Sequence, residues 1–158
     1  MLIFDADGLI KIVHSGIFES IPHTVLISEQ VYTETVVQGK EGLYPDAFEI
    51  EQLIQKKKIV VKKIQISEEI QGLGTGELST YALFLKKNAD AIVSDDRRFL
   101  HFLEQKLIPF IVPTEIIVQL VKKKYITKLA AFVALERLQT KVTKHHYESA
   151  ITALGGKP

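Results

Sequence analysis

The chain has 158 residues, 46% hydrophobic and 25% charged, which is ordinary for one globular domain with its own core. It contains no cysteine, so a disulfide framework, a thiolate metal site and a cysteine nucleophile are excluded. No apolar run approaches the roughly 20 residues that span a bilayer, and the start of the chain, acidic by Asp5, does not resemble a signal peptide. We therefore expect a cytoplasmic protein.

Charge is unevenly distributed along the chain, although the net charge is only +1. Residues 1–52 carry nine acidic side chains against two lysines, a net of −7, so the remaining residues carry +8. One interpretation is surface charge that happens to cluster. The other is a basic part that attracts a polyanion towards a metal ion held by the acidic part. Charge alone does not decide between them.

Strand and helix patterns alternate through the first half of the chain. Apolar runs of high β propensity predict the strands, and apolar residues three and four apart predict the helices. In chain order we predict a strand at 2–4, a helix at 8–13, a strand at 24–27, a helix at 29–38 capped by Ser28, a helix at 46–57 and a strand at 59–66.

The second half continues the alternation and then becomes helical. We predict a tight glycine loop at 72–76, a helix at 78–88, strands at 91–94 and 108–112 around a helix at 96–106, a helix to residue 123 capped by Thr114, and helices at 127–139 and 144–154. Such alternation predicts an α/β fold of three layers, with four to five parallel strands between helices. We expect residues 1–158 to form a single domain that includes the C-terminal helices at 114–155.

Acidic residues recur where predicted strands or loops lead into helices. Asp5 ends the first strand, Asp95 and Asp96 follow the strand at 91–94, and Glu77 lies in the first turn of a helix, with Glu34 inside another. In open α/β sheets ligands bind beyond the carboxyl ends of the strands. Carboxylates gathered there repel one another unless a divalent cation neutralises them, and Mg²⁺ and Mn²⁺ prefer such oxygen ligands. Helix capping is the alternative explanation for each acid.

Four motifs resemble those of PIN-domain nucleases, in the same order, along nearly the whole chain. They are Phe4-Asp5-Ala6-Asp7-Gly8-Leu9-Ile10, Val31-Tyr32-Thr33-Glu34, Leu73-Gly74-Thr75-Gly76-Glu77-Leu78-Ser79, and Ala89-Asp90-Ala91-Ile92-Val93-Ser94-Asp95-Asp96. The resemblance implies a PIN-like α/β/α fold and hydrolysis of RNA with Mg²⁺ or Mn²⁺. It implies that the catalytic and metal-binding acids are Asp5, Glu34, Glu77, Asp95 and Asp96.

The resemblance leaves the division of labour between Asp95 and Asp96 open. Ser94 is expected to orient a carboxylate or a water through its hydroxyl. Asp7 replaces the small hydroxyl residue common at its position in the family, and we interpret it as a helix cap or outer-shell acid. Glu29 competes with Glu34, but an acid in a first helical turn is explained by the helix dipole.

Several basic residues are candidate RNA contacts. Arg97 and Arg98, beside the fourth motif, are predicted to bind RNA phosphates. The lysines at 122–124 are better explained as a helix end. The five histidines have no metal-ligand spacing, and we assign them no catalytic role. Asp90 precedes its strand and is expected at the opposite edge of the sheet.

The resemblance also implies partners. Many relatives are the toxin half of a toxin–antitoxin pair, so a small antitoxin protein and a homodimer are expected partners besides RNA. The alternatives are a housekeeping RNA-processing nuclease and a non-catalytic PIN-like module that binds RNA or protein. A small phosphatase-like or response-regulator-like protein would also have an acidic pocket, but the order of the motifs fits it poorly.

Overall fold

The computed structural model describes residues 1–157 and contains one five-stranded sheet with strand order β3-β2-β1-β4-β5. All strand pairs are parallel, which confirms the predicted α/β fold with a central parallel sheet. The strands are β1 (Leu2–Phe4), β2 (Val25–Ser28), β3 (Ile59–Lys62), β4 (Ala91–Val93) and β5 (Phe110–Ile111).

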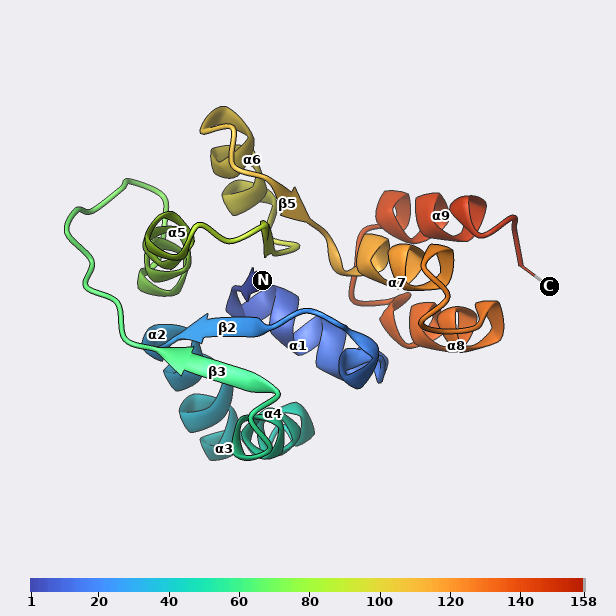
Figure 1. The fold of residues 1–158 in the computed structure, drawn as a ribbon, viewed down its shortest axis with the longest axis horizontal. Helices are drawn as coiled ribbons and strands as arrows, with labels where there is room; N and C mark the ends of the chain where they lie inside the picture. The colour runs from blue at the N-terminus through green and yellow to red at the C-terminus, as the bar shows by residue number, and fades with distance from the viewer. Residues whose placement is uncertain (158) are drawn as a thin grey trace.

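Helices cover both faces of this sheet and form the outer layers (Figure 1). Within residues 1–157 none of them is long and apolar enough to cross a membrane. The helices are α1 (Ala6–Ser15), α2 (Glu29–Tyr32), α3 (Gln38–Glu41), α4 (Pro45–Gln55), α5 (Thr75–Lys87), α6 (Arg97–Gln105), α7 (Pro113–Lys122), α8 (Lys128–Leu138) and α9 (Lys144–Ala153), with a 3-10 turn at Phe18–Ser20 and a π-helical segment at Thr33–Val37 between α2 and α3.

Alternation along the strands divides the core into two clusters. Ile3, Leu26 and Ile92 point to the face covered by α5 and α6. Leu2 and Phe4, on the same strand as Ile3, point to the other face and pack with α1, α4 and the C-terminal helices. Because successive side chains of a strand alternate between faces, each strand from β1 to β4 supplies both cores. Helices α1 and α6 therefore lie on opposite faces.

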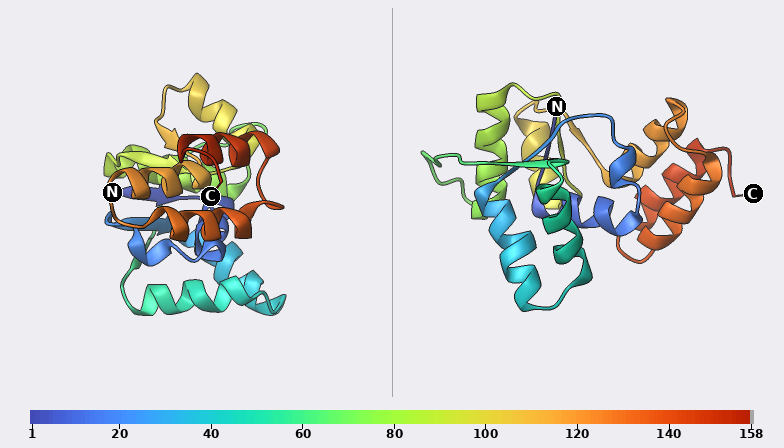
Figure 2. Two further views of the ribbon diagram at one scale, coloured as in Figure 1. Left: turned by 90° about the vertical axis from the view of Figure 1, so that its right-hand side faces the viewer. Right: turned by 60° about the horizontal axis from the view of Figure 1, so that its bottom comes forward.

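The C-terminal helices α7, α8 and α9 pack against one another at one end of the molecule (Figure 2). Ile117, Leu135 and Tyr147, one from each of them, belong to the same buried cluster as Phe4 and Leu9. This shared core supports our proposal that residues 114–155 are part of a single domain.

Two strands are shorter than predicted by more than one residue. β3 ends at Lys62 rather than at residue 66 because its neighbour β2 ends at Ser28, which pairs with Lys62. Beyond that point an edge strand has no partner for its backbone groups. β5 is reduced to Phe110–Ile111 because it pairs only with Ile92 and Val93 of β4. Strand length is thus set by the neighbouring strand and not by local β propensity.

At three helix starts a residue has another role than the one we predicted. α1 begins at Ala6 with Asp5 as its N-cap, so Asp7 is not the cap. α5 begins at Thr75, which places Gly76 inside the helix and not in the preceding loop. α7 begins at Pro113, and Thr114 is therefore not its N-cap. Proline is favoured in a first helical turn because its missing N–H has no helical partner there.

Candidate active site

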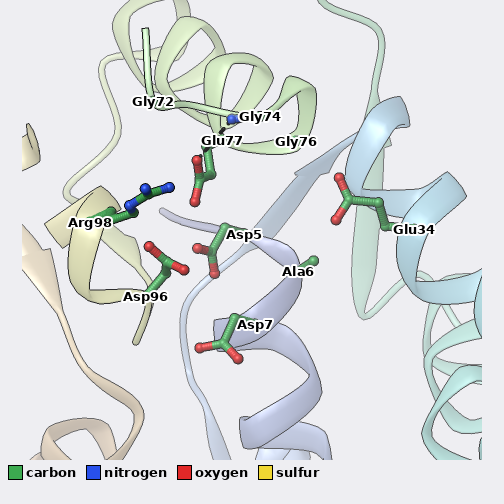
Figure 3. A pocket seen from close by; sticks show the side chains of 10 residues that line it. All are labelled: Asp5, Ala6, Asp7, Glu34, Gly72, Gly74, Gly76, Glu77, Asp96 and Arg98. Carbon is green, nitrogen blue, oxygen red and sulfur yellow. Dashed lines mark hydrogen bonds between the residues drawn. The ribbon is translucent and has the colours of Figure 1, made fainter.

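A pocket of about 360 Å³ opens at the carboxyl edge of the sheet, and we call it the acid pocket. It lies where the neighbouring strands β1 and β4 lead into helices on opposite faces, the position at which parallel sheets bind ligands. Figure 3 shows its lining, which comes from separate segments of the chain: Asp5, Ala6, Asp7, Glu34, Gly72, Gly74, Gly76, Glu77, Asp96 and Arg98.

Asp5 is the buried acid of this pocket, with 3% of its surface exposed. Its Oδ1 accepts a hydrogen bond from the Gly8 backbone N–H at 2.8 Å, and its Oδ2 accepts one from the Ser94 hydroxyl. Burial raises the pKa of Asp5 to about 7, although both hydrogen bonds favour the ionised form and oppose the rise. A nearby cation would therefore stabilise the Asp5 carboxylate.

Glu77 projects from the first turn of α5 into the acid pocket. Its Oε2 accepts a hydrogen bond from the N–H of Gly74, the N-cap, at 3.0 Å. This is one half of a capping box, because glycine has no side chain to supply the other half. Partial burial raises the pKa of Glu77, and the charges of Asp96 and Glu34 raise it further, whereas the Gly74 hydrogen bond and the Arg98 guanidinium lower it.

Asp96 is the N-cap of α6, and its Oδ1 accepts a hydrogen bond from the Phe99 N–H at 2.9 Å. The Asp96 backbone N–H donates to the Ser94 hydroxyl oxygen at 3.1 Å, and that hydroxyl in turn donates to Asp5. Ser94, fully buried, thus couples two acids of the pocket. The structure places Ser94 where we predicted a residue that orients a carboxylate.

Glu34 approaches the acid pocket from the opposite side to Asp96 (Figure 3). It lies in the π-helical segment Thr33–Val37, and such bulges are frequent at functional sites. Its carboxylate lies so close to Gly76 that a Cβ added there would overlap Glu34 Oε1 and lie 3.1 Å from Glu34 Cδ. Desolvation raises the pKa of Glu34. Glycine at position 76 therefore provides the space that this carboxylate occupies.

Asp95 does not line the acid pocket, so the structure separates it from Asp96. Its Oδ2 accepts from Lys11 Nζ at 2.7 Å, and its Oδ1 is 2.9 Å from Nδ1 of His146 in α9. The Asp95 side chain is only 2% exposed. These two contacts occupy both carboxylate oxygens, which indicates that Asp95 holds α1 and α9 in place.

The other predicted residues are divided between the pocket and its surroundings. Arg98 and Asp7 line the acid pocket, whereas Arg97 and Glu29 do not. Asp90 lies at the opposite edge of the sheet, as predicted, where it pairs with the N-terminal amine of the chain.

Three residues that matter to this region were missed in the sequence. Lys11 bridges Asp7 at 3.0 Å and Asp95, and its position one helical turn after Asp7 was the available signal. Gly76 was assigned to a turn, although it is part of a helix. His146 was assigned no role in the sequence, but it is half-buried beside Asp95, and nothing local could relate it to an acid 51 residues away.

The donor chemistry of the acid pocket fits a hard divalent cation, because its acids offer only carboxylate oxygens. Within residues 1–157, no three His, Cys, Asp or Glu side chains lie close enough together to enclose a metal ion among themselves. Mg²⁺ does not require such a cage, since it commonly binds through one or two carboxylates and keeps several waters. Separated acids around one pocket are compatible with that mode.

Comparison with known proteins agrees with this architecture. A family model described as a PIN domain matches residues 1–155. No curated protein and no solved structure matches the chain. PIN domains are generally nucleases and typically use divalent metals, which suits an acidic pocket at the edge of a parallel sheet. The match spans nearly the whole chain and confirms the predicted resemblance: this chain belongs to the PIN-domain family.

Proposed function

We propose that the protein is a cytoplasmic, divalent-metal-dependent ribonuclease that hydrolyses RNA phosphodiester bonds at the acid pocket. The observation that carries the proposal is the buried Asp5, whose pKa is raised to about 7 in a pocket that also holds Glu34, Glu77 and Asp96. Such a set of acids is unfavourable without a cation. Mg²⁺ or Mn²⁺ bound there would supply an activated water and polarise the phosphoryl oxygen.

Each residue has a distinct part in this proposal. One or two of the acids Asp5, Glu77 and Asp96 would bind the cation directly and the others through its waters, and Glu34 completes the acidic wall from the far side of the pocket. Ser94 and the Gly8 N–H keep the Asp5 carboxylate oriented. The Arg98 guanidinium, close enough to Glu77 to lower its pKa, would contact a non-bridging oxygen of the scissile phosphate.

The test is hydrolysis of a fluorescent single-stranded RNA with Mg²⁺ or Mn²⁺, compared among wild type, Glu77→Gln and Asp96→Asn. We expect metal-dependent cleavage by wild type. Each variant should lose more than about 100-fold, since even outer partners of metal ligands typically cost about 10–100-fold. Asparagine remains a good N-cap, so Asp96→Asn should keep α6 intact.

Glu29→Gln is the matched control, because Glu29 begins the helical run that carries Glu34 but does not line the acid pocket. It should cleave at the wild-type rate. Cleavage that survives both Glu77→Gln and Asp96→Asn would refute the site. A folded protein with neither metal binding nor cleavage would favour the non-catalytic binding module over the nuclease.

A toxin role, an antitoxin partner and a homodimer are further parts of the proposal that rest on family resemblance. Support for a protein partner comes from α8, where Leu129 is 69% and Val133 49% exposed one turn apart. Growth arrest on expression, relieved by Glu77→Gln, would support the toxin. Normal growth with an active enzyme would favour a housekeeping RNA-processing nuclease.

The homodimer would be tested by light scattering, which compares the molecular mass of wild type and Leu129→Ser in solution.

A further inference from the structure

A second hollow, of about 870 Å³, adjoins the acid pocket, and we call it the basic groove. Arg98 lines both cavities, and the consecutive residues Asp95 and Asp96 each line one of them. The walls of the basic groove come from α6, β5 and the start of α9, and they include Arg97, Arg98, His101, His145, His146 and Phe110. An extended ligand that leaves the acid pocket past Arg98 would enter this groove.

Helix stability does not explain the cations of the basic groove. Arg97 and Arg98, the two arginines of the groove, occupy the first turn of α6. Cations are unfavourable at helix N-termini, where the macrodipole is positive. Within residues 1–157 neither arginine forms an ion pair. Residues that are unfavourable for the local helix in this way are expected at functional sites.

The acid in the groove wall that is nearest to the arginines in sequence is already neutralised. Asp95 pairs with Lys11 at 2.7 Å and His146 at 2.9 Å, and its side chain is 2% exposed. The Asp95 carboxylate therefore repels an anion in the groove only weakly. Glu104, the other lining acid, lies about two helical turns beyond Arg97 on α6.

The basic groove also has an apolar part, formed by Leu100, Phe110 and Val112. The Phe110 ring is on the edge strand and is 37% exposed. Stacking of a nucleobase on an aromatic side chain contributes about 1–3 kcal/mol and tolerates any base. Cations beside an exposed aromatic ring are the combination that single-stranded nucleic acid binding requires.

We propose that the basic groove binds the single-stranded RNA segment next to the scissile phosphodiester. A phosphate one or two nucleotides away contacts Arg97 and His145, a base stacks on Phe110, and Arg98 lies between the two cavities. This assignment rests on the proposed ribonuclease function and adds a substrate subsite to it. It gives α9, far from the acidic motifs in sequence, a role in substrate binding.

Binding of a fluorescent single-stranded RNA octamer, followed by anisotropy in a chelator so that no cleavage occurs, tests the groove. We expect the Arg97→Gln/His145→Gln variant to bind about 10-fold more weakly than wild type, because it loses a charge-assisted phosphate contact. Its salt dependence should be shallower by about 0.7 for one lost contact. Phe110→Leu should weaken binding without changing that slope.

The matched control is Lys86→Gln/Lys87→Gln, which removes two charges from the last turn of α5, away from the described pockets. It should bind like wild type. Equal affinity of the Arg97/His145 variant and wild type, or an equal loss in the control, would overturn the inference. If RNA binding depends on the groove but the protein does not cleave RNA in Mg²⁺, the ribonuclease is refuted and RNA binding by the groove stands. If the protein cleaves RNA but binding does not depend on the groove, the groove alone is refuted.

Discussion

Asp5 serves two purposes that place opposite demands on its charge. As the N-cap of α1 it accepts hydrogen bonds from Gly8 and Ser94, which favour the carboxylate. As a buried group it loses hydration, which favours the neutral acid and raises its pKa to about 7. Without a cation, the protein at neutral pH therefore holds a partly protonated acid where the proposed reaction needs an anion.

Asp5→Asn should stabilise the metal-free protein at pH 8. The unfolded Asp5 ionises near its ordinary pKa of 3.8, whereas the folded one retains its proton to about 7. Between these values the folded state binds more protons, so stability falls as pH rises. Asparagine has no charge to desolvate and remains a good N-cap.

Urea unfolding in a chelator at pH 8 and pH 5 measures this effect. Wild type should be less stable at pH 8 by a few kcal/mol, since one pKa unit corresponds to about 1.4 kcal/mol. The variant should lose most of that difference. An identical pH dependence in the two proteins would contradict the raised pKa of Asp5.

Gly76→Ala should impair activity without destabilising the fold. The new methyl group would displace the Glu34 carboxylate, which is the mobile end of a long side chain, whereas alanine improves the helix by up to about 1 kcal/mol. We expect at least about a 10-fold loss of cleavage with an unchanged or higher melting temperature. Cleavage by Gly76→Ala at the wild-type rate would contradict the proposed part of Glu34.

At the scale of elements, Asp95 joins parts of the chain that no local signal relates. Lys11 comes from α1, His146 from α9, and Asp95 from the loop between β4 and α6. The contacts of Asp95 with Lys11 and His146 explain why one of two adjacent acids is structural and the other faces the acid pocket. They also connect the C-terminal helices to the sheet edge at which the proposed chemistry occurs.

Asp95→Asn should destabilise the protein by on the order of 2 kcal/mol, because the Lys11 ammonium loses the closer of its two carboxylate partners and keeps only Asp7. Chemical denaturation at pH 7 measures this loss. Asp90→Asn, which removes an exposed acid paired with the N-terminal amine, is the control and should leave the unfolding midpoint unchanged. Equal midpoints for Asp95→Asn and wild type would contradict the structural role of Asp95.

The acid pocket is a property of the whole molecule, because the segments that line it are brought together only by the parallel sheet. Glu34 and Glu77 lie on helices packed side by side, and Asp5 and Asp96 follow neighbouring strands. Their mutual repulsion opposes folding, so a cation that binds only the folded state should stabilise the entire domain.

Mg²⁺ or Mn²⁺ should therefore raise the melting temperature, and the increase should be larger at pH 8 than at pH 6. A ligand must be deprotonated to bind a metal, and Asp5 with a pKa of about 7 is increasingly protonated below that pH. At a metal concentration of about 100 times the dissociation constant, binding adds about 2.7 kcal/mol to the free energy of unfolding. Thermal scans with and without metal at the two pH values measure it, and Glu77→Gln should respond less.

Local patterns in the sequence predicted most elements but not where they end. Ser28 was correctly identified as an N-cap, since its hydroxyl accepts from the Val31 N–H at 3.0 Å. The strand beginning at Ile59 was predicted too long, because its length depends on β2 and not on its own apolar residues. The π-helical turn that carries Glu34 had no recognisable pattern.

The sequence by itself determined the fold class, the family and the set of candidate acids. These depend on local periodicity and on motifs that can be read within a few residues. Only the tertiary structure decided which acids meet: Asp96 faces the acid pocket and Asp95 pairs with Lys11 and His146. That choice depends on contacts between residues far apart in the chain. These contacts give each carboxylate its partner, and the burial that they create raises the pKa of Asp5.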